Sequence, residues 1–180
     1  MYNIITNIIE VSDYKPIIEI DNKYIINFDK VDLMENETVK VNGKMVQTGN
    51  MVPTGKCIYS SFTCPNTLTV DEIVNKINEL INNEVTYLIK NHFYWNGYNI
   101  NLSSENQMNY KNAFDLAVAT EGDSLPITFK FKKNGKNEYY TFDTVSELKD
   151  FYIKVNKYIN ECLQDGWRRK DAINPEDYKI

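Results

Sequence analysis

Cysteine, proline, glycine and histidine are all scarce in this chain of 180 residues, which contains 3, 5, 7 and 1 of them. The cysteines, Cys57, Cys64 and Cys162, are odd in number and have no patterned spacing, which argues against a disulfide framework and a Cys-x-x-Cys metal site. We therefore expect three reduced cysteines that behave as small, partly buried apolar residues.

Long hydrophobic runs are also missing, because no apolar stretch approaches the roughly 18 residues that a membrane helix needs. The first residues have neither a basic region nor a small-residue cleavage site, so a secretory signal is not expected. The composition, 42% hydrophobic and 25% charged, is that of a globular protein with one ordinary domain or two small units. We expect a soluble protein that is used without export and has no membrane partner.

Positive charge is in deficit, and the formal net charge is −5. Non-specific binding of nucleic acid needs a positive surface that displaces counterions from the phosphates. The overall charge therefore favours a protein partner and predicts no nucleic-acid ligand.

The chain offers few groups for catalysis. His92 is the only histidine, so a His-dependent triad or metal centre would have to include it, and no nucleophile motif accompanies it. The segment Gly49–Lys56 resembles a phosphate-binding loop, but five residues instead of four separate its glycines, and Cys57 stands where Ser or Thr is required. We predict a non-enzymatic protein with no catalytic residue, cofactor site or metal site.

The hydrophobic pattern predicts an α+β fold, in which a small antiparallel β unit precedes a three-helix module with two β-hairpins. Residues 1–66 show strand patterns on either side of Asp21–Lys23, and Asn42-Gly43 between apolar flanks predicts a hairpin. The segment Thr48–Lys56 holds two glycines and a proline and is predicted as a loop. We interpret residues 1–66 as an N-terminal β-rich docking unit.

Residues 67–173 are predicted as a module of helices and hairpins. Three capping boxes mark the helix starts: Thr69 with Glu72, Ser104 with Gln107, and Thr144 with Glu147. Asn96-Gly97 and Asn134-Gly135 predict the two hairpin turns. The third helix ends either at Gly166, which would cap it, or near Ala172. Residues 174–180 are predicted as a tail outside the core.

Aromatic residues are dense, with 13 Tyr, 8 Phe and 2 Trp. Interfaces favour Tyr and Trp, because each buries a large area and keeps a polar group available, and a platform that stacks bases or sugars is the alternative. The only compact basic cluster, around residues 168–170, either complements a helix C-terminus or pairs with an acidic neighbouring subunit. The candidate protein-interface residues are Trp95, Tyr98, Glu105, Asn106, Asn109, Trp167, Arg168 and Arg169.

One set of motifs carries a family resemblance over roughly residues 70–173. The matching residues are Trp95, Asn96, Gly97, Leu102, Ser103, Gln107, Asn109, Phe129, Phe142, Leu148, Trp167, Lys170 and Ile173. In this order the segment resembles an uncharacterised domain family found in phage tail-fibre and tail-assembly proteins. The resemblance is closest to forms from phages of gut Bacteroidetes.

This resemblance implies a phage virion structural protein, an adaptor or decoration component of the tail or head-fibre apparatus. It implies location in the virion, after synthesis in the cytoplasm of the bacterial host. The partners implied are tail, portal or fibre proteins and further copies of the chain in a symmetric assembly. A tail-fibre assembly chaperone that is absent from the mature virion is the alternative, and a small phage enzyme or host-takeover factor is a third hypothesis.

Overall fold

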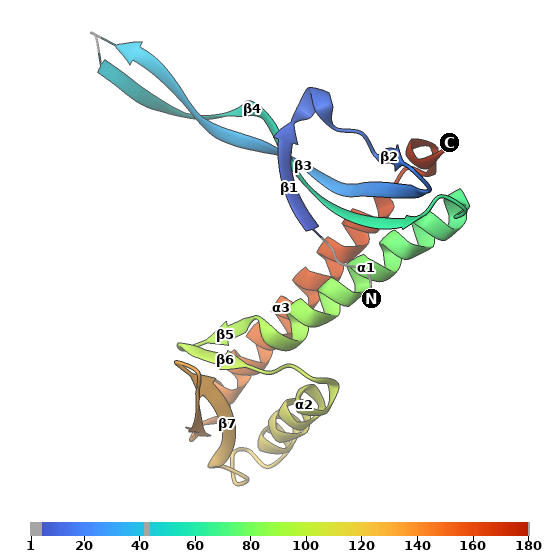
Figure 1. Ribbon diagram of the computed structural model, residues 1–180. Helices are drawn as coiled ribbons and strands as arrows, with labels where there is room; N and C mark the ends of the chain where they lie inside the picture. The colour runs from blue at the N-terminus through green and yellow to red at the C-terminus, as the bar shows by residue number, and fades with distance from the viewer. Residues whose placement is uncertain (1–4, 42–43, 180) are drawn as a thin grey trace. The chain divides into compact units, whose positions relative to one another are not determined.

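The computed structural model describes residues 5–41 and 44–179 and divides the chain into two units. The β unit comprises Met1–Asn78 and Ala172–Ile180, and the helical unit comprises Glu79–Asp171. The described residues form three α-helices and eight strands in two antiparallel sheets, which confirms the predicted α+β class (Figure 1). The predicted boundary after residue 66 precedes helix α1 (Val70–Asn91), whereas the two units divide inside that helix.

A four-stranded sheet in the order β1-β4-β3-β2 builds the β unit. Its strands are β1 (Ile5–Glu10), β2 (Ile17–Ile20), β3 (Lys23–Val41) and β4 (Lys44–Pro65). The predicted strands around Asp21–Lys23 are confirmed as the β2–β3 pair. Asn42 and Gly43, the predicted turn, lie outside the described residues, but Val41 and Lys44 pair with each other on either side of them. The buried apolar side chains of the unit come from β3, β4, the start of α1 and the C-terminal segment: Tyr24, Ile26, Phe28, Cys57, Phe62, Cys64, Ile73, Ile77 and Tyr178.

The prediction of a loop over Thr48–Lys56 is wrong, because these residues belong to β4. Gly49 and Gly55 do adopt positive φ angles, 83° and 79°, but they lie where the β3–β4 register shifts. A β-bulge uses such dihedrals while the strand continues on both sides. The glycines therefore mark two bulges within a long strand and not the end of a strand.

The C-terminal residues also differ from their prediction as a tail outside the core. A short 3-10 helix, η2 (Pro175–Tyr178), begins after Asn174, whose side chain accepts a hydrogen bond from the backbone N–H of Glu176. Tyr178 at its end is only 5% exposed. The C-terminus is thus part of the β unit.

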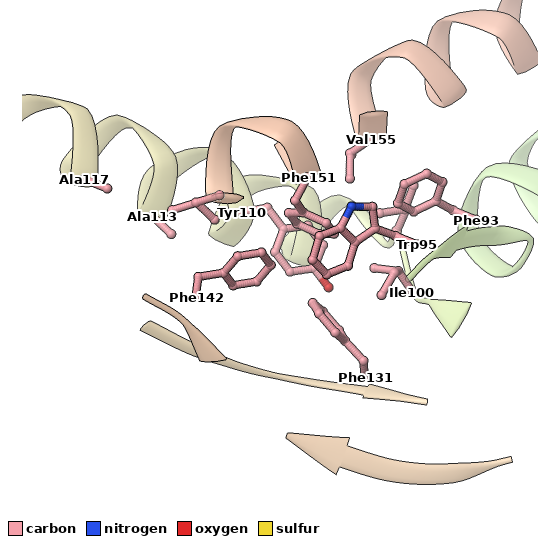
Figure 2. Close-up of a cluster of buried hydrophobic side chains, with 12 residues drawn as sticks. Phe93, Trp95, Ile100, Tyr110, Ala113, Ala117, Phe131, Phe142, Phe151 and Val155 are labelled. Carbon is pink, nitrogen blue, oxygen red and sulfur yellow. The ribbon is translucent and has the colours of Figure 1, made fainter. Parts of the chain in front are cut away.

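The helical unit combines the second sheet with helices. After α1, the elements are β5 (Phe93–Trp95), β6 (Tyr98–Ile100), α2 (Ser104–Ala119), β7 (Ile127–Lys133), β8 (Lys136–Phe142) and α3 (Val145–Asp171), and the sheet order is β5-β6-β7-β8. Trp95, Phe131, Phe142 and Phe151 lie at the centre of its core, where Phe131 and Phe142 point from the strands toward the helices (Figure 2). The core is therefore built mainly from aromatic rings on one face of the sheet.

Both predicted hairpin turns of this unit are confirmed. Asn96 and Gly97 have φ angles of 47° and 78°, and Asn134 and Gly135 have 50° and 77°. Two consecutive residues with positive φ suit the tight turns whose twist matches that of the flanking strands, and Asn-Gly favours this geometry. These turns place Trp95 opposite Tyr98 and Lys133 opposite Lys136.

The helix starts follow the predicted caps with two changes. Thr69 and Glu72 form the full capping box, since each side chain bonds the backbone N–H of the other residue. The cap of α2 is Ser103, which accepts from Asn106 N, so the prediction of Ser104 was wrong by one residue. At α3 the Thr144 hydroxyl caps Glu147 N, whereas the Glu147 carboxylate accepts from the Tyr140 hydroxyl.

Helix α3 passes through Gly166 and ends at Asp171, which decides between the two predicted ends. Gly166 is buried, and a Cβ placed on it would lie 2.7 Å from Cγ2 of Val85 on α1. This glycine lets a neighbouring side chain approach the helix backbone closely. It thus has a packing role and does not cap the helix.

Candidate functional site

The most distinctive surface of the β unit is the arm, which we define as residues 33–41 of β3 and 44–55 of β4. β2 pairs with β3 only over Lys23–Ile26, and β1 pairs with β4 only over Lys56–Ser61, so the arm consists of two strands alone. Figure 1 shows these strands continuing as a twisted ribbon past β1. The nine residues of β3 in the arm, 33–41, give it a length of roughly 25–30 Å.

No layer of the β unit covers the arm. Among its described side chains, those of residues 33–40 and 44–55, none is buried. A two-stranded hairpin by itself is marginally stable in water and usually needs a third strand or a packed helix. The arm therefore presents both faces and both edges to solvent.

Two bulges of the same design shape the arm. In each, three residues of β4 with the sequence Thr-Gly-x stand opposite a single residue of β3: Thr48-Gly49-Asn50 opposite Glu37, and Thr54-Gly55-Lys56 opposite Leu33. Bulges bend a strand and increase its right-handed twist. The repeat of Thr-Gly after six residues is the sequence signal that could have identified this pair.

The threonine hydroxyls hold both bulges closed. Thr54 Oγ1 donates to Leu33 O at 3.0 Å and accepts from Lys56 N at 3.2 Å. Thr48 Oγ1 accepts from Asn50 N at 3.2 Å and donates to a Glu37 carboxylate oxygen at 2.8 Å. The hydrogen bonds from Thr48 and Asn50 lower the pKa of the Glu37 carboxyl, because they favour its charged form. These hydrogen bonds thus fix the backbone conformation of the arm at both bulges.

One face of the arm is rich in methionine. Side chains alternate between the faces of a strand, and the register pairs Met34 with Pro53, Asn36 with Met51, and Lys40 with Met45. Met34, Met45 and Met51 therefore share a face, where they are 47%, 66% and 54% exposed. Flexible, polarizable methionine side chains adapt to partner surfaces and are frequent at interaction sites. We call this surface the methionine face.

The two edges of the arm differ in their protection. The β4 edge carries Pro53, which has no N–H to donate, and both bulges, and such features block the addition of another strand. The β3 edge carries no proline from Met34 to Val41, and the bulges lie on the opposite strand. A strand from a partner would therefore add more readily at β3.

The predicted interface residue Trp95 is instead part of the core, with only 4% of its surface exposed. Its ring stacks on Phe142 at a centroid distance of 5.4 Å, and its indole N–H points to Asp150 at 3.4 Å. Tyr98 is half-buried and meets the same Tyr140 ring as Trp95 does. The structure brings Trp95 and Tyr98 together, but both rings pack against Tyr140 and do not form an exposed interface.

The polar candidates at the start of α2 have different surroundings. Asn106 is half-buried, and its side-chain amide donates to Asn101 O at 2.9 Å, which ties the helix start to the preceding loop. Glu105 and Asn109 are exposed on the same helix. Glu105 and Asn109 are thus accessible, whereas Asn106 already has a local structural role.

The candidate interface residues near the end of α3 also differ in their exposure to solvent. Trp167 is exposed, and Arg168 pairs with Asp165 one turn earlier. The Arg169 side chain is only 10% exposed and pairs with Glu84 of α1 at 2.7 Å. The two arginines of the basic cluster therefore have acidic partners within the helical unit, and the side chains of Trp167 and Arg168 remain accessible.

The groups considered for catalysis do not converge in the described part of the chain. His92 packs its ring against Tyr87 with centroids 5.1 Å apart. Cys57 and Cys64 are buried, Cys162 is half-buried, and all three are free thiols. No group of three His, Cys, Asp or Glu side chains in residues 5–41 and 44–179 is arranged to hold a metal ion. None of the helices in these ranges is long and apolar enough to cross a membrane.

Comparison with known protein families adds one match. Residues 72–180, more than half of the chain, match DUF4376, a domain of unknown function. The chain belongs to the DUF4376 family. No curated protein and no solved structure matches it.

The DUF4376 match covers nearly all of α1, the helical unit and the C-terminal segment with Tyr178. The strands β1–β4, and with them the arm, precede the matched residues. The sheet that carries the arm is thus an N-terminal addition to the DUF4376 region in this chain, and the matched C-terminal segment forms one compact unit with it.

Proposed function

We propose that this DUF4376 protein is a non-enzymatic structural component of a phage virion, and that the arm is the element by which it docks onto another virion protein. The uncovered two-stranded arm with its methionine face is the observation that supports docking. The phage setting rests on the resemblance of residues 70–173 to tail-fibre and tail-assembly proteins. The partner would be a tail, portal or fibre protein.

Burial of the methionine face would supply binding energy. Removing a Met side chain fully from water is worth roughly 1.5–3 kcal/mol, and Met34, Met45 and Met51 are all about half exposed or more. The open β3 edge would add backbone hydrogen bonds to such a contact, as strand addition does in other complexes. A protein that repeats around a virion axis would present the arm once per subunit.

The proposal is tested by the protein inventory of purified particles. The phage that encodes the chain is prepared in three forms: wild type, Met34→Ser with Met51→Ser, and Met108→Ser. Met108 is 63% exposed on α2 and provides a matched control outside the arm. Mass spectrometry is expected to find the wild-type and control chains in the particles, with the double variant depleted at least about tenfold.

Two outcomes would overturn the proposal. If the wild-type chain is abundant in infected cells and missing from particles, it is an assembly chaperone or another non-virion factor. If the double variant enters particles as well as the wild type does, the arm is not the docking element. Met34 and Met51 are both exposed, so their replacement is expected to leave the folded state intact.

A further inference from the structure

The helical unit has an uncovered sheet face opposite its aromatic core. Figure 2 shows Phe131 pointing from its strand toward the helices, and the side chains that alternate with such core residues along β5–β8 therefore point away from the helices. The register aligns Tyr94, Asn99, Lys132 and Asn137 in one row across all four strands. We call this surface the outer face.

The rest of the outer face is equally polar. Lys130 stands opposite Tyr139 in the β7–β8 ladder, and the hydroxyls of Thr128 and Thr141 are joined by a hydrogen bond of 2.8 Å. No carboxylate belongs to these rows, so the face offers cations and hydrogen-bonding groups but no negative charge.

Positive charge gathers on this face and at its hairpin turn. Lys130 and Lys132 lie on the face, whereas Lys133 and Lys136, which flank the Asn134-Gly135 turn, alternate to the opposite side, where Lys133 Nζ lies 4.8 Å from the centre of the Tyr98 ring. In the part of the chain that the structure describes, none of these four lysines forms an ion pair. The two uncompensated lysines of the outer face, with Lys133 and Lys136 at the end of the sheet, create a local positive potential even in a chain of net charge −5.

Two aromatic rings stand out from the same face. Tyr94 and Tyr139 are 66% and 73% exposed, the highest values of any aromatic side chain among the described residues. Lys130 Nζ lies 5.8 Å from the centre of the Tyr139 ring, so cation and ring are presented together. An ordinary solvated sheet face does not require large rings in water, because burial of their area would be favourable.

A hollow of about 410 Å³ lies beside β5 and is lined by Tyr94 of the outer face and by residues from the helix side of the sheet, among them Phe93, Tyr158 and Glu161. Tyr94 lines both the hollow and the outer face, and His92, Lys154 and Lys157 contribute from α3 and from the residue before β5. Lys154 and Lys157 pair with acidic neighbours at 2.8 and 3.8 Å, so they add less free charge than the β7 lysines. The volume is within the range of small-ligand sites.

We infer that the outer face binds single-stranded nucleic acid. Exposed rings stack on unpaired bases, lysines contact the phosphates, and the exposed Asn137 provides a donor and an acceptor for base edges. A double helix would not use the rings, because its bases are already stacked. An acidic protein would contact the lysines but would leave Tyr94 and Tyr139 without a role.

This inference is independent of the proposed function, because the outer face and the arm share no residue. The net charge of the whole chain describes an average, whereas binding depends on the local field of the face that meets the ligand. We expect modest affinity with strong salt dependence, since contacts between lysines and phosphates release counterions.

The test uses the full chain and labelled oligo(dT) and oligo(rU) of about 15 nucleotides, with fluorescence anisotropy at about 50 to 200 mM salt. In Lys130→Gln with Lys132→Gln, the slope of log Kd against log salt is expected to decrease by about 1.4. Tyr94→Leu and Tyr139→Leu are each expected to weaken binding at least about fivefold, while Tyr94→Phe and Tyr139→Phe retain the ring and the affinity. Lys40→Gln with Lys44→Gln in the arm makes the same charge change and is expected to leave binding unchanged.

Three results would overturn the inference. Absence of an anisotropy change at low salt would exclude the ligand class. Equal loss of binding in the arm control and in the β7 lysine variant would show that only net charge matters. Tighter binding of a polyglutamate peptide, or of a duplex of the same length, would assign the face to an acidic protein or to double-stranded nucleic acid.

Discussion

The hydroxyl of Tyr178 donates a hydrogen bond to the backbone oxygen of Asn27 at 3.2 Å, across 151 positions of sequence. The same oxygen accepts from Tyr14 at 3.1 Å, and the buried Asn27 amide donates to Lys15 O at 2.7 Å. A buried carbonyl must be satisfied, and here two distant segments satisfy it together. The C-terminal segment of the DUF4376 region thus completes the N-terminal sheet.

Two variants that weaken this contact are expected to destabilise the β unit to different degrees. Tyr178→Phe loses one hydrogen bond, while Tyr14 still satisfies Asn27 O, and should lower the free energy of unfolding by about 0.5–1 kcal/mol. Tyr178→Ala also loses a buried ring and should cost about 3 kcal/mol. Urea unfolding monitored by circular dichroism measures both. Tyr139→Phe, at an exposed ring, is the control, and a Tyr178→Ala protein as stable as the control would contradict this role.

Alkaline pH is expected to weaken the same contact. Burial raises the pKa of Tyr14 from 10.0 to about 12, with a further increase from nearby Asp177, and burial likewise raises the pKa of Tyr178. The folded state therefore holds protons that the unfolded chain releases above pH 10. The contribution of Tyr14 is complete below pH 10 and is lost as the pH rises through about 12, and the contribution of Tyr178, whose pKa is also raised, is lost in the same direction.

The measurement compares the free energy of unfolding at pH 9 and pH 11 in the wild type and in Tyr14→Phe. Phenylalanine cannot ionise, so the variant should lose less stability over this interval. Identical losses in the two proteins would show that Tyr14 titrates as a free tyrosine.

Gly166 is expected to resist replacement although it lies inside a helix. Alanine normally stabilises a helix interior relative to glycine by about 1 kcal/mol, but here its Cβ would lie 2.7 Å from the stiff side chain of Val85. Gly166→Ala should therefore destabilise the protein by about 1–2 kcal/mol through overpacking. Thermal or urea unfolding measures the change in stability. Adding Val85→Ala should remove the clash and restore part of the stability that alanine gives to a helix interior. A stabilised Gly166→Ala single variant would contradict the close approach.

The bulges of the arm depend on glycine for their backbone shape. Gly49 has a φ of 83° and open space around the position of a Cβ, so Gly49→Ala introduces backbone strain without a steric clash. The strain is worth about 1–2 kcal/mol and should appear as faster amide hydrogen exchange over residues 44–55. Gly49→Asn is the matched control, because asparagine tolerates positive φ better. Unchanged exchange in Gly49→Ala would mean that the bulge does not need this dihedral.

Local signals predicted much of the fold. The Thr69 and Glu72 cap, the Asn-Gly turns at residues 96 and 134, and the alternation of β7 are confirmed, because each depends on residues within a few positions of one another. The same local logic failed at Thr48–Lys56, since glycines with positive φ occur both in loops and in bulges. Only the partner strand distinguishes these cases.

The candidate surfaces were predicted less well. Trp95 was expected at an interface because tryptophan is frequent there, yet residues far along the chain, Phe142 and Phe151, enclose it. The methionine face depends on the β3–β4 register across the bulge opposite Glu37, and the pairing of the two strands is needed to bring Met45 and Met51 to the face of Met34. The outer face likewise follows from the pairing of β5, β6, β7 and β8.

The sequence by itself determined where helices start to within one residue, where the hairpins of the helical unit turn and how β7 alternates, because these features need only short-range hydrogen bonds and backbone preferences. Tertiary structure decided that α3 continues past Gly166, that Tyr178 packs against the first sheet and bonds to Asn27, and that Trp95 is buried. Each of these depends on contacts between residues far apart in sequence. The physical reason is that burial and close packing belong to pairs of elements and not to either element alone.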